Sequence, residues 1–252
     1  FDILKDRSIG NLWIINSDGT NHQKLTSIES AEYGAVWSPS GDRIAFISST
    51  DQGPEIYVYW KNSSKYARIS QLEGSPSNLV WSTNGENLAF TMKVKTSPPV
   101  LVTMPKKPTG AKWAKTARIT DRLYHEADGK GYIDNGFTHV FLISAEGSGI
   151  SQLTSGDFNH LGPLSWSKNN SKIYFTSNRS ASWEYEFRNS EIYSVDINDK
   201  KINSLTDRNG PDFSPKESPN GKYIAYLGFA DRVQAYQNTE LLLMDSTGKN
   251  KR

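Results

Sequence analysis

Four charged side chains that could contact a ligand lie in one short segment, NRSASWEYEFRN, at residues 178–189. They are Arg179, Glu184, Glu186 and Arg188. The two carboxylates could hold a free amino group of a ligand, because an ammonium group donates charge-assisted hydrogen bonds to carboxylates. A solvated or structural charge cluster is the alternative, since loops are ordinarily polar. The sequence leaves both interpretations open.

Covalent catalysis by this chain is not predicted. A serine nucleophile on a strained strand-to-helix turn requires small residues on both sides, in the pattern G-x-S-x-G. The nearest fragment is Gly147-Ser148-Gly149, but Glu146 and Ile150 occupy the two positions that must be small, so a turn between strands is predicted instead. We therefore expect no catalytic residue in this chain.

Metal and cofactor sites are not predicted either. The chain has no cysteine, which excludes disulfides, a thiol nucleophile and cysteine-ligated metals. Its four histidines are separated by at least 14 residues and form no paired metal-ligand motif. They are His22, His125, His139 and His160, and we expect them to be structural or exposed.

The charge balance argues against two classes of partner. Lys and Arg total 29 and Asp and Glu total 27, which makes a formal net charge of +2. This balance supplies no electrostatic case for nucleic acid or for an anionic membrane surface. No apolar run approaches the ~18 residues that span a bilayer. The cellular compartment is not decided, because cytoplasmic and exported proteins can both lack cysteine.

A repeated phrase identifies the elements that must position these side chains. WSPSGDRIAF begins at Trp37, WSTNGENLAF at Trp81, WSKNNSKIYF at Trp166 and ESPNGKYIAY at Glu217. The copies are 44, 85 and 51 residues apart, and the first and third spacings approach the ~40–50 residues of a propeller blade. Trp37, Trp81 and Trp166 are therefore predicted to fill the same position between adjacent blades.

Each copy is predicted to form four short antiparallel strands. The tetrad Ser-Pro-x-Gly, or its Asn-containing variant, predicts a tight turn, because Pro presets φ and Gly or Asn tolerates positive φ. Apolar runs on both sides of the turn, and two more runs further along the copy, predict strands. The predicted fold class is all-β, a β-propeller of four-stranded blades that occupies residues 1–252 as a single domain.

The two ends of the sequence indicate an incomplete ring of about four blades. Residues 11–26 match the third and fourth strands of a blade, and the copy that begins at Glu217 supplies strands one to three. These halves are not complementary, so an open stack is predicted. Its unprotected strand edges would favour association into a homo-oligomer.

Long segments are predicted to crowd one end of the blades. The 85-residue spacing implies an insertion at residues 94–137, and shorter excursions occupy residues 178–190 and 228–238. All three connect a second strand to a third, and antiparallel strands place such connections at the same end of every blade. Three side chains are expected to pack where the insertion returns to the sheets: Arg122, Tyr124 and Tyr132.

Several tracts resemble the propeller domain of the prolyl oligopeptidase family, in particular its acylaminoacyl-peptidase and dipeptidyl-aminopeptidase branch. The tracts are ITDRLYHEADGKGYI at residues 119–133, THVF at 138–141, QLTSGDF at 152–158, TSNR at 176–179, GPD at 210–212, SPNG at 218–221 and YQNT at 236–239. They follow the family's order over nearly the whole chain. The blade repeats alone resemble TolB-like propellers equally well.

This resemblance implies a non-catalytic domain of a serine peptidase. In the family the propeller precedes an α/β-hydrolase domain with the catalytic Ser, Asp and His, and its loops restrict entry to short peptides. The implied partners are such a hydrolase domain, which this sequence lacks, and short peptides, whose amino group acidic side chains hold in related dipeptidyl peptidases. No motif here is strict enough to transfer that role to Glu184 or Glu186. The alternative function is a free-standing TolB-like propeller that presents its loops to a protein partner.

Overall fold

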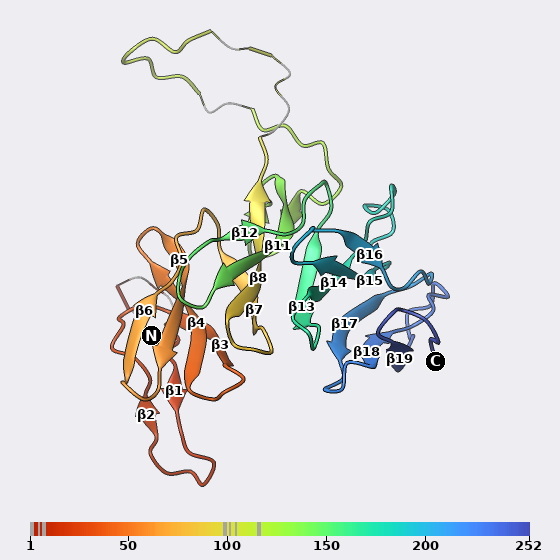
Figure 1. The fold of residues 1–252 in the computed structure, drawn as a ribbon. Coiled ribbons are helices and arrows are strands. Elements are labelled where there is room, and N and C mark those ends of the chain that lie inside the picture. The colour runs from red at the N-terminus through yellow and green to blue at the C-terminus, as the bar shows by residue number, and fades with distance from the viewer. Residues whose placement is uncertain are drawn as a thin grey trace.

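The chain forms a row of antiparallel β-sheets stacked against one another (Figure 1). The computed structural model describes residues 3–4, 6, 9–97, 100, 102–103, 105–114 and 117–252. Within them the secondary structure is strands and turns, and no helix long and apolar enough to cross a bilayer is present. The predicted all-β fold with four-stranded blades is confirmed.

The blades follow one another in sequence order. The first blade contains β3 (Glu32–Trp37), β4 (Arg43–Thr50), β5 (Gly53–Trp60) and β6 (Lys65–Arg68). The second contains β7 (Pro76–Trp81), β8 (Asn87–Lys95), β11 (Gly136–Ser144) and β12 (Ser151–Gln152). The third contains β13 (His160–Trp166), β14 (Lys172–Ser177), β15 (Glu191–Asp196) and β16 (Ile202–Ser204). The fourth contains β17 (Asp212–Glu217), β18 (Tyr223–Gly228) and β19 (Glu240–Asp245). Two separate hairpins lie outside the blades. One pairs β1 (Trp13–Ile14) with β2 (Gln23–Lys24), and the other pairs β9 (Glu126–Ala127) with β10 (Gly131–Tyr132).

The turn between the first two strands is built in the same way in every blade. In the first blade, the backbone N–H of Ser38 donates to the carbonyl of Arg43 (2.9 Å), and the Ser38 hydroxyl accepts from the Arg43 N–H (3.0 Å). Gly41 has a φ of 71°, in the left-handed region that Gly and Asn tolerate best. The equivalent residues are Ser82 with Gly85, Ser167 with Asn170, and Ser218 with Gly221.

Apolar side chains of the second strands pack toward both neighbouring blades. In β8, Leu88 and Phe90 pack toward the first blade, whereas Ala89 packs toward the third. In β14, Phe175 packs toward the second blade and Tyr174 toward the fourth. All five side chains are at most 2% exposed. Because alternate residues of a strand point to opposite faces, the hydrophobic core is divided into layers between blades.

Two of the repeat tryptophans link adjacent blades, and the third does not. Trp81 is 6% exposed and its indole N–H donates to the Val36 carbonyl (3.0 Å) of the preceding blade. Trp166 is 5% exposed and donates in the same way to the Val80 carbonyl (3.3 Å). Trp37 is 50% exposed, which corrects the prediction that it also lies between blades. The element before the first blade is the two-stranded hairpin β1–β2, which offers no first strand for Trp37 to contact.

Glu217 replaces the tryptophan in the fourth blade and links the blades with different chemistry. Its carboxylate accepts hydrogen bonds from the Tyr174 hydroxyl (2.8 Å) and from the backbone N–H of Lys168. Burial and this hydrogen bond raise the pKa of the Tyr174 phenol, so the phenol is a hydrogen-bond donor to the carboxylate. The third and fourth blades are therefore joined by a charge-assisted hydrogen bond in place of an indole contact.

The hairpin β1–β2 and the fourth blade lie at opposite ends of the row (Figure 1). β1 pairs with β2 and β19 pairs with β18, so the described residues form the open row that was predicted. Arg252 exchanges two backbone hydrogen bonds with Leu243 (2.9 and 2.8 Å), along the edge of β19 where the other blades carry their fourth strand. The last copy therefore extends beyond the three strands that its sequence indicated.

Trp81→Ala is expected to lower the free energy of unfolding by about 3–5 kcal/mol, because it opens a cavity between blades and removes a donor from the Val36 carbonyl. Trp37→Ala is the matched control, since it changes the same residue type at the same repeat position on a half-exposed side chain. We expect it to cost about 1 kcal/mol or less. Urea unfolding followed by circular dichroism measures both. Equal losses would show that the tryptophan position does not link blades.

A half-buried and a buried carboxylate, Glu191 and Asp212, occur where the third and fourth blades meet. Glu191 opens β15 and Asp212 opens β17. Burial raises the pKa of Glu191 to about 7, and the nearby Asp212 charge adds to this, although a hydrogen bond with Thr206 acts in the opposite direction. Among the described residues, Glu191 Oε2 is buried without a hydrogen-bond partner. The folded chain therefore favours the protonated form of Glu191.

Glu191→Gln is expected to stabilise the chain at alkaline pH and to leave its stability unchanged at acid pH. The pKa of Glu191 rises from 4.5 to about 7 on folding, so its contribution to stability is fully present below the lower value and is lost as pH rises to the upper one. The urea midpoints of the two proteins should coincide at about pH 4 and differ most at about pH 8. A difference that does not change with pH would contradict this assignment.

Candidate functional site

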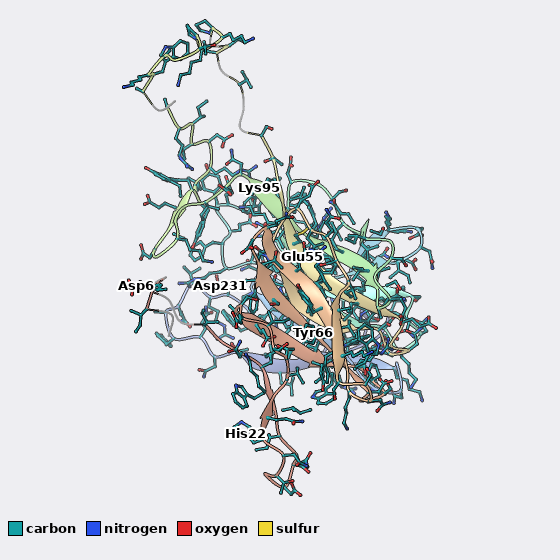
Figure 2. The ribbon with its side chains drawn as sticks, turned by 90° about the vertical axis from the view of Figure 1, so that its left-hand side faces the viewer. Asp6, His22, Glu55, Tyr66, Lys95 and Asp231 are labelled. Carbon is teal, nitrogen blue, oxygen red and sulfur yellow. The ribbon has the colours of Figure 1, made fainter. Side chains whose placement is uncertain are left out.

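Two long excursions meet at one end of the second and third blades. Residues 96–135 connect β8 to β11, and residues 178–190 connect β14 to β15. Lys95, the last residue of β8, lies at this end, whereas Tyr66 of β6 lies toward the opposite end (Figure 2). We call this end of the blades the loop face.

Arg122 joins the two excursions. Its guanidinium group lies 3.6 Å from the Glu184 carboxylate and 5.8 Å from the ring centre of Trp183, both in the second excursion. It also lies 4.5 Å from the ring centre of Phe137, the second residue of β11. Arg122 thus packs where the insertion returns, as predicted, whereas Tyr124 and Tyr132 are 69% and 57% exposed. Glycine is required at this return, because Gly136 has a φ of 128° and a Cβ there would lie 2.1 Å from the Val94 carbonyl oxygen.

A cavity of about 1370 Å³ lies between the excursions and the ends of the strands. Lys93 and Thr138 line it from the second blade, and Thr176 lines it from the third. Six aromatic side chains contribute to the wall: Tyr124, Phe137, Trp183, Phe187, Phe213 and Phe229. The last two belong to the fourth blade, so three consecutive blades contribute to one cavity.

Arg179 connects the second excursion to the third blade. It donates a hydrogen bond from Nη1 to His160 Nε2 (2.6 Å), and its guanidinium group stacks on Phe158 at 4.8 Å. Burial lowers the pKa of His160 to about 3, with a further contribution from the charges on His139 and Arg179. His160 is therefore neutral and can accept the Arg179 hydrogen bond. His139 and His160 are structural, as expected, and they contact each other through Nδ1 (3.1 Å).

The two glutamates of this segment have different roles. Glu184 lines the cavity and forms the ion pair with Arg122. Glu186 accepts a hydrogen bond from the Ser182 hydroxyl, which holds its pKa below the usual range, and its carbonyl accepts from the Asn178 amide (2.9 Å). Glu186 therefore stabilises the turn and does not face the cavity.

Arg188 completes the set of predicted contacts. It lines the cavity and its guanidinium group lies 5.5 Å from the ring centre of Phe187. The structure thus brings Glu184 and Arg188 to the cavity, whereas Arg179 and Glu186 build the loop that carries them. Sequence spacing did not distinguish the two pairs, because the loop has no regular periodicity.

Charged residues outside this segment were missed by the sequence analysis. Asp134 pairs with Lys95 (2.9 Å), and the charges of Lys93 and Arg118 also help to hold the pKa of Asp134 below its usual range. Burial lowers the pKa of the Lys93 amine; the Asp134 charge opposes this effect, and the positive charges of Lys95 and Arg122 add to it. These residues are brought together by the return of the insertion, and no sequence motif connects them.

Ser148 and the acidic and histidine side chains bear on catalytic and metal-binding chemistry. Ser148 lies in the turn between β11 and β12, where its carbonyl accepts from the Ser144 N–H (3.2 Å). The described residues contain no group of three or more His, Asp or Glu side chains that could hold a metal ion.

The chain is similar in sequence to peptidase proteins. It matches the dipeptidyl peptidase IV (DPP IV) N-terminal region over residues 111–228. Dipeptidyl-peptidase 5 of Porphyromonas gingivalis is 24% identical over 241 residues, which cover 90% of this chain and 34% of that protein. The chain thus spans about a third of the length of this relative.

Solved structures show the same fold. An acylaminoacyl peptidase of Pyrococcus horikoshii superimposes with a TM-score of 0.71 at 14% identity, over 98% of this chain and 35% of that chain. TolB from Acinetobacter baumannii superimposes with a TM-score of 0.55 at 17% identity, over 93% of this chain and 46% of that chain. The repeated blades, the match to a peptidase N-terminal region and these likenesses lead to one assignment. The chain is a β-propeller, and its residues 111–228 match the family of the dipeptidyl peptidase IV N-terminal region.

Proposed function

We propose that this chain is the non-catalytic propeller of a serine peptidase and that its loop face selects short peptides for a hydrolase domain of the same protein. The observation that carries the proposal is the cavity of about 1370 Å³, which three blades line. Sites for drug-sized ligands have volumes of about 300–1000 Å³, so this cavity can hold a peptide of a few residues.

The construction of the cavity suits a size filter. Its walls are separate excursions, and the Arg122–Glu184 ion pair fixes their positions relative to each other. A short peptide can enter such a space, whereas a folded substrate would contact the excursions first. The mixture of aromatic and charged side chains offers contacts both to apolar side chains and to the polar main chain of a peptide.

A free-standing interaction module remains the second candidate, because TolB shares the fold. The two candidate functions require different surfaces on the loop face. Protein partners of a rigid domain usually meet a surface with a packed core and a polar rim. The loop face instead has a cavity, and this feature favours a small ligand over a protein surface.

The chain by itself is expected to show no peptidase or esterase activity. No described serine forms a hydrogen bond to a histidine. The described histidines form hydrogen bonds with carbonyl oxygens, with Thr154 and with Arg179, and His139 and His160 bond to each other. A fluorophosphonate probe should label no serine, and chromogenic aminoacyl and acyl-peptide substrates should not be turned over. Stoichiometric labelling of one serine would overturn the non-catalytic assignment.

Arg122→Gln in the protein that contains this chain is expected to impair cleavage of peptides selectively. The change removes the ion pair with Glu184 and the contact with Trp183, so the two excursions lose their fixed spacing. We expect kcat/KM for a short peptide to fall about tenfold, the effect of losing one well-placed charged contact. The rate for a small aryl ester, which needs no selection by the cavity, should not change.

Arg68→Gln is the control for this experiment, because Arg68 is an exposed residue of β6 in the first blade and does not line the cavity. It should leave both rates unchanged. Equal losses of peptide and ester activity in Arg122→Gln would contradict selection by the loop face. The absence of any hydrolase domain from the protein would contradict the peptidase assignment and favour the interaction module.

A further inference from the structure

Positive charges outnumber negative charges around the cavity of the loop face. Five cationic side chains line it, namely Lys93, Lys95, Arg118, Arg122 and Arg188. Three carboxylates line it, namely Asp121, Asp134 and Glu184. The cavity therefore has a local excess of positive charge, although the whole chain is nearly neutral, and a concave site of one sign attracts the opposite charge.

Two of the three carboxylates already have partners. Asp134 lies 2.9 Å from the Lys95 amine, and Glu184 lies 3.6 Å from the Arg122 guanidinium group. The Glu184 charge is thus balanced by Arg122, although its Oε1 atom is buried without a hydrogen-bond partner in the part of the chain that the structure describes. Among the described residues, Lys93, Arg118 and Arg188 have no carboxylate within 4 Å, and Asp121 has no cation within 4 Å, so unpaired cations outnumber unpaired carboxylates in the cavity.

Lys93 is the cation for which a counter-ion would matter most. Its amine donates a hydrogen bond to the Asp134 backbone carbonyl, which carries no full charge. The side chain is partly buried, and this burial lowers the pKa of the amine. The Asp134 charge acts on Lys93 from beyond ion-pair distance, and a partly buried ammonium group without a carboxylate in direct contact gains more from a carboxylate ligand than an exposed one does.

Arg118 lies near the same point. Its guanidinium group stacks on the Tyr132 ring at 4.4 Å, and its charge contributes to the lowered pKa of Asp134. Stacking occupies the face of a guanidinium group and leaves the N–H donors at its edge available. Lys93 and Arg118 thus both lie close enough to Asp134 to act on it electrostatically, and they offer donors to one anion.

The aromatic wall provides the other part of the site. Phe187 is 74% exposed and lines the cavity together with Trp183, Phe213 and Phe229. The lining therefore combines uncompensated cations with apolar rings. A ligand that contacts both the cations and the rings has a carboxylate next to an apolar side chain. The C-terminal residue of a peptide has this combination.

We propose that the loop face binds the C-terminal carboxylate of a short peptide, with Lys93 and Arg118 as the anion-binding groups and the aromatic wall as the contact for the last side chain. This inference rests on the proposed function, because it specifies which end of the peptide the cavity holds. The alternative, in which acidic side chains of residues 178–189 hold the amino end, would orient the peptide in the opposite direction.

The test compares three peptides with blocked amino ends in isothermal titration calorimetry on the 252-residue chain. The probes are acetyl-Ala-Ala-Phe as the free acid, the same peptide as its amide, and acetyl-Ala-Asp-Phe amide. The free acid should bind at least about tenfold more tightly than its amide, the effect expected for one or two charge-assisted hydrogen bonds. This preference should diminish in high salt.

Two variants identify the groups that bind the carboxylate. Lys93→Met keeps most of the apolar stem and should weaken binding of the free acid to the level of the amide, with no effect on the amide itself. Lys172→Met is the matched control, because Lys172 lies at the opposite end of β14 from the cavity. Arg118→Gln changes a residue outside the blades, so it tests the site even if Lys93→Met fails to fold.

The possible outcomes separate the two proposals. Equal affinity for the free acid and its amide overturns the carboxylate inference and leaves peptide selection standing. Binding of the aspartate peptide as tightly as the free acid shows that any carboxylate is accepted and overturns the C-terminal assignment. A lack of binding by all three peptides contradicts both this inference and the proposed function. A loss confined to the free acid in Lys93→Met or Arg118→Gln supports the inference.

Discussion

Phe46, Phe90 and Phe175 have no solvent-exposed surface, and each belongs to the second strand of its blade. Adjacent residues of these strands point to opposite faces, and both faces are apolar, so a blade buries its surface only between two neighbours. The stacking of the blades is a consequence of this constraint. It also explains why a two-stranded hairpin covers the outer face of the first blade, where Ile44 and Phe46 would otherwise be exposed.

Stacked blades expose their strand ends, and for this reason the candidate site lies there. Connections between second and third strands all emerge at one end, and the two longest come from adjacent blades. Insertions at this position do not disturb the layers of the core. Arg122 and Glu184 then join two segments about 60 residues apart in sequence, and the cavity depends on this contact.

The residue that joins adjacent blades always occupies the same position in the repeat, but its type differs from blade to blade. Trp81 and Trp166 each fill the space with an indole and donate to a carbonyl of the preceding blade. Glu217 occupies the same position and accepts from the Tyr174 hydroxyl. An indole donor and a carboxylate acceptor both satisfy the polar groups at the interface, and buried polar groups require such partners. The blades thus keep their spacing although the residue that joins them changes.

The sequence by itself determined the repeat, the strand order and the turns, because these depend on local properties. Ser38 and Gly41 recur with their equivalents at fixed offsets, and each forms its turn through bonds only a few residues away. The sequence also located the segment of the site at residues 178–189. Only the tertiary structure decided which of its charges face the cavity, since Glu184 has its partner in another blade's insertion. The exposure of Trp37 likewise depends on its neighbour and not on its own residue type, because burial is a property of two surfaces in contact.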